Sequence, residues 1–300
     1  MLELTPDTCR AVLEDLPIGV YMTDRKRQIV FWNTSAERIT GYLGQEVIGH
    51  FCHDNLLMHC DENHVILCGN ACPLANTMHD GRPRETRAFL RHKEGQRIPV
   101  RVHAIPIRDE AGAIVGAAEC FEETSFRAAN IRSARFRSDV SLDGETGIPD
   151  QQAAQAGFHA ALDEFAASQA PFGVLSIAVD DVEHLRRVSG WQAANEVLYA
   201  VAQTLSSGTR PDDLVARWRE DRFTALVRCP NADGLRSCAE RLARLVSLAS
   251  VPWWGDRLSV TVSAGGTMVR HGDGLESLLA RAEEALHAAI AAHSDSVVVI

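Results

Sequence analysis

The sequence predicts a chain of two domains, an α+β half built on an antiparallel sheet and a second half of mixed α/β character. Its length of 300 residues suits two domains of about 100–180 residues each. In the first half, short strands of alternating polarity are joined by hairpin turns. In the second half, strands alternate with longer helical segments. A hydrophobic content of 46% is enough to build a core in each half.

The net charge of the chain argues against some classes of binding partner. With a net charge of −10, the chain lacks the basic surface that non-specific binding to nucleic acid or to an anionic membrane requires. The first residues, MLELTPDTCRAVLEDLP, are polar and acidic and do not resemble a signal peptide. No run of about 18 apolar residues predicts a transmembrane helix. We therefore expect a cytoplasmic protein with no nucleic-acid partner and no membrane insertion.

The first half contains five expected strands with a helical stretch after the second. The strands alternate in polarity between turn signals and cover 18–24, 28–33, 84–92, 96–109 and 113–123. The stretch SAERITGYLGQEVIGH predicts helix ending in glycines. The segments LPIGVYMTDRKRQIVFWNTSAERITGYLGQEVIGH and HKEGQRIPVRVHAIPIRDEAGAIVGAAECFEE resemble a PAS sensory domain, which we assign to residues 1–122. This resemblance implies a five-stranded antiparallel sheet around a pocket for a small molecule or cofactor, often in a dimer.

A Cys-rich insert, residues 52–72, lies between these two segments. Its pattern C…H…LCxxxCPL resembles a variant of PAS domains attached to diguanylate cyclases, and it marks Cys52, His59, Cys68 and Cys72. Three thiolates and an imidazole suit zinc or an iron–sulfur cluster. The four-residue spacing of Cys68 and Cys72 predicts that both sulfurs share one face of a helical turn. Haem is another candidate, with an axial ligand among His53, His59, His64 and His79. The alternative is that these cysteines are small buried hydrophobic residues.

The segment 123–143 joins the two halves. Phe126, Ile131 and Phe136 give it a thin apolar stripe with arginines between. This pattern predicts a short amphipathic helix that forms the seam of a homodimer and transmits changes between the domains. The alternative is a solvated spacer.

The second half alternates strands and helices around one hairpin. Helices are expected at 193–205, 232–249 and 275–293, and strands at 172–181, 213–218, 222–227, 257–269 and 296–300. The motifs TGIPD, LSIAVDDVEHLRRVSGWQAANEVL, RWREDRF and VTVSAGG resemble, in order, those of a GGDEF domain, the fold of diguanylate cyclases. We assign this domain to residues 144–300. The resemblance implies a mixed sheet with helices packed around it.

The metal-binding positions of that family are largely replaced. Diguanylate cyclases join two GTP molecules into cyclic di-GMP, which requires carboxylates that hold divalent metals on the triphosphate. By the resemblance, the first metal-binding Asp aligns with Ala178, and the Glu that follows the acidic turn position aligns with Arg222. Asp221 keeps the acidic position, and Asp180 matches a second Asp that is not the principal ligand. The resemblance therefore predicts no catalytic Mg²⁺.

The nucleotide-binding positions are replaced as well. The guanine-reading Asn and Asp of the family align with Arg186 and Asn195, and the late phosphate-contacting Lys aligns with Ile290. The two glycines of the turn, which let backbone approach the nucleotide, align with Arg219 and Glu220. We interpret the domain as a degenerate, catalytically inactive cyclase.

A second site of the family keeps its residues. Arg210 and Asp213 form an RxxD pattern at the family's inhibitory site, where cyclic di-GMP binds, and Arg241 matches a second arginine expected on the next helix. Arginine can bond bidentately to guanine O6 and N7, and Asp can accept hydrogen bonds from the Watson–Crick edge. The alternative is an ordinary surface turn with an exposed ion pair.

The sequence thus predicts a cyclic di-GMP receptor under PAS sensory input that acts on an unknown downstream protein. One alternative is an active diguanylate cyclase with an atypical active site. Another is a PAS metal or redox sensor whose GGDEF domain serves as a dimerising scaffold.

Overall fold

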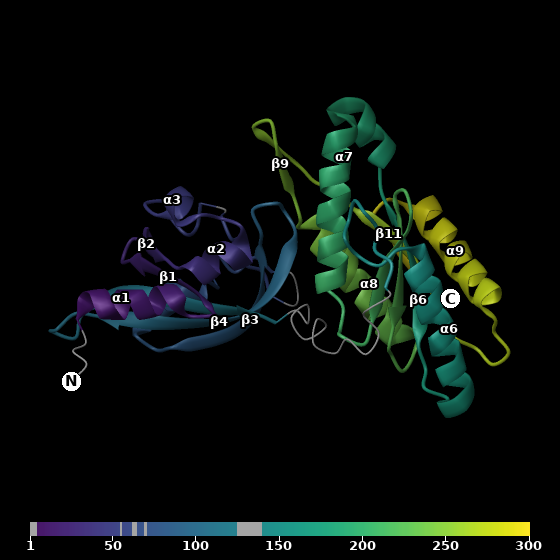
Figure 1. The fold of residues 1–300 in the computed structure, drawn as a ribbon, viewed down its shortest axis with the longest axis horizontal. Helices are drawn as coiled ribbons and strands as arrows, with labels where there is room; N and C mark the ends of the chain where they lie inside the picture. The colour runs from purple at the N-terminus through teal and green to yellow at the C-terminus, as the bar shows by residue number, and fades with distance from the viewer. Residues whose placement is uncertain (1–4, 55, 62–64, 69–70, 125–139) are drawn as a thin grey trace. The chain divides into compact units, whose positions relative to one another are not determined.

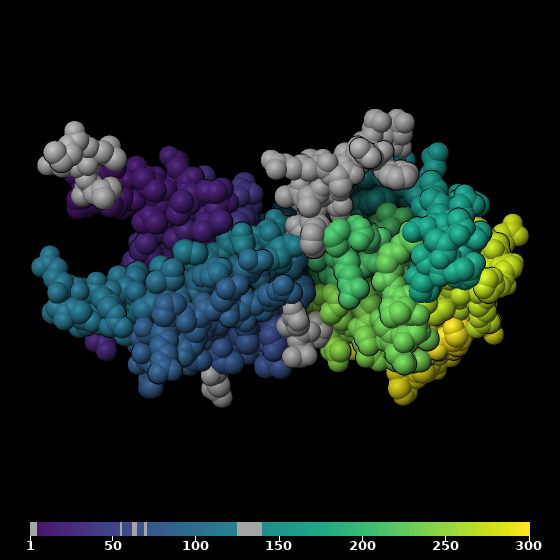
Figure 2. Space-filling view, turned by 90° about the horizontal axis from the view of Figure 1, so that it is seen from below, coloured from purple at the N-terminus to yellow at the C-terminus, as the bar shows by residue number. Residues whose placement is uncertain are grey.

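The computed structural model describes residues 5–54, 56–61, 65–68, 71–124 and 140–300. The chain divides into two compact units, 1–93 with 98–125 and 94–97 with 126–300. In the space-filling view, purple and blue residues form the first unit and teal to yellow residues the second (Figure 2). Most of the segment predicted as a signalling helix, with Phe126, Ile131 and Phe136, lies outside the described residues.

The first unit is built on a five-stranded antiparallel sheet, as the resemblance to a PAS domain implies (Figure 1). The strand order is β2-β1-β5-β4-β3. Its elements are α1 (Pro6–Asp15), β1 (Gly19–Asp24), β2 (Ile29–Trp32), α2 (Thr34–Thr40), α3 (Gly44–Val47), α4 (Pro73–Asp80), β3 (Arg84–Arg91), β4 (Arg97–Arg108) and β5 (Ile114–Glu123). The core contains an aromatic cluster of Tyr21, Trp32 and Phe121, with ring centroids 5.5–6.5 Å apart.

Local chemistry fixes the start and end of α2. The Asn33 side chain accepts hydrogen bonds from the backbone N–H groups of Ala36 and Val20, both at 2.8 Å. Asn33 therefore caps the helix and at the same time ties it to β1. The helix ends at Gly41, whose φ of 75° is the left-handed conformation that glycine adopts at low cost.

The second unit is a mixed sheet in the order β12-β11-β6-β8-β7, in which only the β11–β12 pair is parallel. Its elements are α6 (Gln151–Ser168), β6 (Gly173–Val179), α7 (Val182–Ser207), β7 (Leu214–Arg219), β8 (Arg222–Val227), α8 (Ala232–Ser247), β9 (Val251–Trp253), β10 (Asp256–Leu258), β11 (Val262–Met268), α9 (Leu275–Ala292) and β12 (Val297–Val299). One buried cluster joins α7 and α8 to the sheet, and another joins α6 and α9 to it. Helices therefore cover both faces (Figure 1).

Two strands of this unit differ from the prediction. The expected single strand over 257–269 is divided, because residues 251–258 fold back as a separate hairpin, β9–β10. Trp254 and Gly255 form its turn with φ of 48° and 91°, a conformation that a tryptophan seldom adopts. The hairpin β7–β8 is tighter than expected: Arg219 pairs with Arg222, so only Glu220 and Asp221 form the turn.

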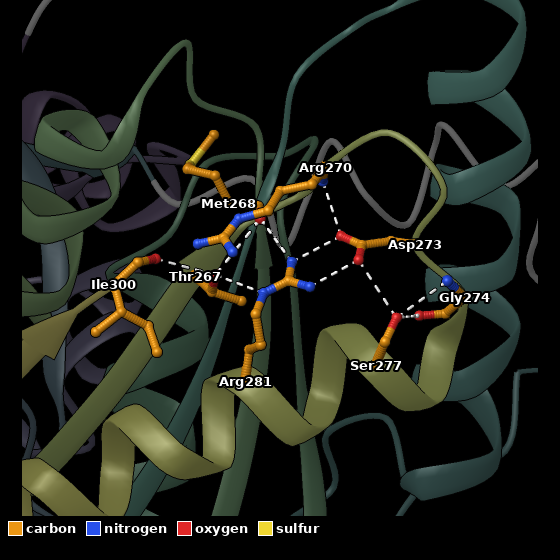
Figure 3. A network of polar contacts seen from close by, with 8 residues as sticks. All are labelled: Thr267, Met268, Arg270, Asp273, Gly274, Ser277, Arg281 and Ile300. Carbon is orange, nitrogen blue, oxygen red and sulfur yellow. Dashed lines mark hydrogen bonds and ion pairs between the residues drawn. The ribbon is translucent and has the colours of Figure 1, made fainter.

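The helix α9 lies close against β11. A Cβ atom on Gly265 would lie 1.9 Å from the backbone nitrogen of Leu286, so only glycine fits at this position. In the N-terminal half of α9, Arg281 donates both to Asp273 and to the carbonyl of Met268 (Figure 3). Thr267 Oγ1 donates to the carbonyl of Ile300 at 3.0 Å. This network connects α9, β11 and the strand that follows α9.

Candidate functional sites

The RxxD residues lie on the turn that leads into β7. The Asp213 carboxylate accepts hydrogen bonds from the backbone N–H of Arg210 at 2.9 Å and from that of Arg228 at 2.8 Å. Asp213 therefore closes the turn and holds it against the end of β8. The Arg210 side chain is exposed on this turn. The Asp213 carboxylate is thus held by backbone donors, and the Arg210 side chain extends from the turn that it closes.

Arg241 reaches the same turn from α8. Its guanidinium donates to the carbonyl of Gly208 and lies 3.7 Å from the sulfur of Cys238. Gly208 precedes Arg210 by two residues, so the structure brings the two arginines to one short stretch of backbone. Burial raises the pKa of the Cys238 thiol, while Arg241, Arg210 and, with the opposite sign, Asp213 act on it electrostatically. The three predicted residues are therefore neighbours.

An arginine also holds the turn between β7 and β8. The buried Arg217 donates to the carbonyl of Glu220 at 2.6 and 3.0 Å. Its other contacts are Glu145 at 2.6 Å and Asp143 at 3.1 Å. Although burial opposes it, hydrogen bonds from Thr146 and Arg217 lower the pKa of Asp143. Neither turn residue has a positive φ, so bulky side chains are accommodated there without backbone strain.

An arginine occupies the region where the family places its metals. Ala178 is buried on β6, and its cross-strand partner on β8 is Arg222. The guanidinium of Arg222 lies 3.8 Å from a carboxylate oxygen of Asp221 and 4.0 Å from one of Glu283. The guanidinium of Arg222 is a positive charge beside the Asp221 carboxylate, and like charges repel.

Asp180 accepts hydrogen bonds that hold neighbouring segments of the domain together. Its carboxylate accepts hydrogen bonds from Thr261 Oγ1 at 2.6 Å, from Ser263 Oγ at 2.9 Å and from the backbone N–H of Asp295 at 3.0 Å. These three donors come from the start of β11 and from the loop before β12. These hydrogen bonds hold both segments against the end of β6.

Arg186, at the position of the guanine-reading Asn, packs within its own helix segment. Its guanidinium lies 4.6 Å from the ring centroid of Trp191 and 3.0 Å from Glu183. The contact with Trp191 follows from a break in α7 at Gly190, where φ is 87° and ψ is 170°. The segment after β6 therefore lacks the amide that would read guanine.

The side chains at the other replaced positions lie on α7, β7 and α9. The Asn195 side chain donates to Glu145 at 3.4 Å, a long hydrogen bond. Arg219 ends β7 with an exposed side chain, and Ile290 presents an apolar, 42% exposed side chain on α9.

In the first unit, one pocket brings together the four predicted cysteine and histidine positions. Cys52, His59, Cys68 and Cys72 all line it, together with Glu119 from β5. The pocket encloses about 380 Å³ including open space at its mouth. Residues from two separate stretches of the insert therefore meet at one place on the sheet.

The structure adds Glu119 and Tyr21, which sequence reasoning missed. These residues are cross-strand partners on β5 and β1, and both side chains are almost fully buried. Glu119 lies 3.3 Å from Nε2 of His59. Burial raises the pKa of Glu119 to about 7, and a hydrogen bond from Tyr21 opposes this rise. The sequence did contain a signal for Glu119. It alternates with Ala117 and Phe121, so the three side chains lie on the same, inward face of one strand.

The helical prediction for the two later cysteines is wrong. Cys72 is the N-cap of α4 with extended backbone, because Pro73 takes the first helical position, and Cys68 lies in a preceding turn. They share the pocket but no helix face. Within the described residues, no three Cys, His, Asp or Glu side chains converge closely enough to coordinate one ion.

The haem-ligand candidates differ in position. His59 is buried at the pocket, His53 is exposed but lines the pocket, and His79 is exposed on α4. His64 lies outside the described residues.

Comparison with known families identifies both units. The family described as "Diguanylate cyclase, GGDEF domain" matches residues 140–296, just over half of the chain. The chain belongs to the GGDEF family. A "PAS domain" family matches residues 17–125, so both resemblances of the sequence are confirmed. The protein combines a PAS domain with a GGDEF domain, an arrangement of cyclic di-GMP signalling proteins.

Curated relatives match over part of their length. Diguanylate cyclase DgcP of Pseudomonas aeruginosa is 29% identical over 162 residues, 53% of this chain and 24% of the relative. Diguanylate cyclase DgcM of Escherichia coli K12 is 31% identical over 121 residues, 39% of this chain and 28% of the relative. The chain thus spans about a quarter of the length of these relatives.

Solved structures confirm the fold of the second unit. Diguanylate cyclase SiaD of Pseudomonas aeruginosa, in complex with its activator SiaC, superposes with a TM-score of 0.53 at 23% identity, over 58% of this chain and 66% of that one. The GGDEF domain of DgcB from Caulobacter crescentus, in complex with c-di-GMP, gives 0.52 at 21% identity, over 54% and 94%. Within the described part of this chain, no helix has the length and apolar character of a membrane span.

Proposed function

We propose that the protein is a cyclic di-GMP receptor whose GGDEF domain has lost cyclase activity and acts under the input of its PAS domain. Ligand binds at Arg210, Asp213 and Arg241, and the resulting change is read by a downstream protein. A homodimer is the expected form in which the two domains communicate.

The arrangement of the two arginines supports ligand binding. Cyclic di-GMP offers guanine edges and two phosphates, which an arginine guanidinium recognises by paired, charge-assisted hydrogen bonds. Arg210 is exposed, and Arg241 is held beside it by the Gly208 carbonyl. Asp213 is engaged by two backbone N–H groups, so its role includes shaping the turn that presents Arg210. The binding surface is thus organised before ligand arrives.

The single observation that best supports loss of catalysis is Arg222 beside Asp221. A cyclase needs its carboxylates to neutralise divalent metals on the triphosphate. Here Ala178 offers no ligand, and the Arg222 guanidinium stands 3.8 Å from Asp221. A positive side chain therefore takes over the neutralisation of that carboxylate, and a metal ion at the same place would be repelled.

Two matched variants test ligand binding. In equilibrium dialysis, wild type is expected to bind cyclic di-GMP with micromolar or tighter affinity. Arg210→Ala is expected to weaken binding at least 30-fold, because it removes a charge-assisted contact worth about 2 kcal/mol or more. Arg187→Ala removes an exposed arginine elsewhere on the domain and is expected to leave binding unchanged. Equal loss in both variants, or undetectable binding by wild type, would overturn the proposal.

A turnover assay separates the receptor from the alternative of an atypical active cyclase. Wild type incubated with GTP and Mg²⁺ is expected to yield no cyclic di-GMP above a protein-free control. Detectable product that scales with protein concentration would establish a working cyclase instead.

A further inference from the structure

Three of the cysteines meet at the pocket of the PAS domain. Cys52 and Cys68 lie in turns, Cys72 caps α4, and all three side chains line the same pocket. The remaining cysteines of this unit do not line it: Cys9 is exposed on α1, Cys60 is buried in the core, and Cys120 lies on the strand face opposite Glu119. Three of the four cysteines of the insert thus meet at one place.

The chemistry of the pocket favours a single small cation. Its enclosed part has room for about one water-sized particle, which is too little for haem or an iron–sulfur cluster without expansion. Thiolate sulfur and imidazole nitrogen are the ligands that zinc prefers. We propose that the PAS pocket binds one soft divalent metal ion of the zinc class through Cys52, Cys68, Cys72 and His59, with Glu119 orienting the His59 ring.

The pair of His59 and Glu119 fits such a site. The two side chains are 8% and 2% exposed and lie 3.3 Å apart, an ion-pair distance without the alignment of a good hydrogen bond. Histidines that bind metals are commonly oriented by a carboxylate on the other ring nitrogen, and losing that carboxylate typically costs 10–100-fold in metal affinity. Glu119 supplies this carboxylate from the rigid centre of the sheet. It acts here as a positioning residue.

Binding requires the thiols to converge, since the described side chains do not stand at coordinating distance from a common point. A change of χ1 from one staggered rotamer to another moves a cysteine sulfur by about 3 Å. Cys52 and Cys68 lie in turns rather than in a helix, so no preceding helical turn restricts their χ1 rotamers. Each thiol that binds releases its proton as it becomes a thiolate.

Metal titration of the full chain tests the site. Purified protein, stripped with chelator, is titrated with Zn²⁺ against a chromophoric competitor. We expect one ion per chain in wild type, at least 100-fold weaker binding in Cys68→Ala/Cys72→Ala, and 10–100-fold weaker binding in Glu119→Gln. The matched control, Cys9→Ala/Cys120→Ala, removes two thiols outside the pocket and is expected to bind as wild type does.

A second measurement keeps the proposal testable if the pocket variants fold poorly. Co²⁺ added to wild type is expected to give the near-ultraviolet absorption of thiolate-to-cobalt charge transfer, with the intensity of several sulfur ligands. Less than one Zn²⁺ per chain, the same loss in the control variant, or Co²⁺ bound without that absorption would each overturn the proposal. The outcome does not depend on cyclic di-GMP, which is measured separately on the other domain.

Discussion

Replacing Arg281 by methionine tests whether the polar network at the start of α9 stabilises the GGDEF domain. Arg281 donates to the two carboxylate oxygens of Asp273 at 2.6 and 2.7 Å, to the Met268 carbonyl at 3.1 Å and to Thr267 Oγ1 at 3.3 Å (Figure 3). Methionine keeps much of the apolar stem but none of these donors. The Asp273 carboxylate retains only the weaker support of the Arg270 N–H and the Ser277 hydroxyl.

The size of the effect follows from the burial of the pair. The side chains of Arg281 and Asp273 are 19% and 8% exposed. An exposed pair contributes about 0–1 kcal/mol, whereas removing one partner of a buried pair costs about 3–5 kcal/mol. We expect Arg281→Met to lower the free energy of unfolding of this domain by about 2–3 kcal/mol. For a domain of this size that corresponds to roughly 4–12 °C in Tm.

The loss of stability in Arg281→Met depends on pH, because Asp273 is titratable. The hydrogen bonds from Arg281 lower the pKa of Asp273 in the folded state. A depressed carboxyl pKa contributes stability that is present above the unfolded pKa of about 3.9 and is lost as pH falls through the folded pKa. The difference between wild type and Arg281→Met is therefore constant near pH 7 and shrinks below about pH 4.

The free energies of unfolding are measured by urea denaturation, with tryptophan fluorescence as the signal. Four of the five tryptophans lie in the GGDEF unit, so their signal reports chiefly on it. Arg187→Met, an exposed arginine, serves as the control and should cost under about 0.5 kcal/mol. A loss for Arg281→Met no larger than that of the control, or a difference that grows toward low pH, would refute the reasoning.

Three further variants probe the region that the resemblance assigns to the cyclase active site. Asp180→Ala leaves three donors, among them Thr261 and Ser263, without their acceptor, and should cost about 1–3 kcal/mol in urea unfolding. Arg217→Met removes the hydrogen bonds to the Glu220 carbonyl in the β7–β8 turn, so we expect faster hydrogen exchange of the turn amides. Amides in the centre of the sheet should keep their protection. Unchanged exchange in the turn would show that Arg217 does not hold it. Arg222→Ala still lacks the first metal ligand, so calorimetry should detect no Mg²⁺ binding below millimolar concentration and GTP should yield no product.

The sequence predicted the architecture because its patterns are local. Strands of alternating polarity and helices of 3.6-residue period indicated both sheets, and the order of GGDEF motifs matched the order of elements in the second unit. The β9–β10 hairpin was missed, since its turn places Trp254 at positive φ, which residue preferences disfavour. The position of α4 could have been inferred more accurately, because Pro73 after Cys72 signals the start of a helix.

Sequence spacing shows which candidate residues share a turn, but contacts between residues far apart in the chain depend on tertiary structure. Arg210 and Asp213 share a turn, but the contact of Arg241 with Gly208 depends on how α8 packs. The PAS pocket depends even more on tertiary structure, because Glu119 is far from the cysteine insert in sequence. Glu119 meets the cysteine insert because β5 lies at the centre of the sheet. This strand order cannot be deduced from the spacing of residues along the chain.

We propose that the GGDEF domain binds cyclic di-GMP without making it. Calorimetric titration of cyclic di-GMP into the full wild-type chain measures this binding directly. We expect saturable binding with a micromolar or tighter Kd. No heat, together with no binding in an equilibrium assay at concentrations up to 100-fold above the micromolar range, would contradict it.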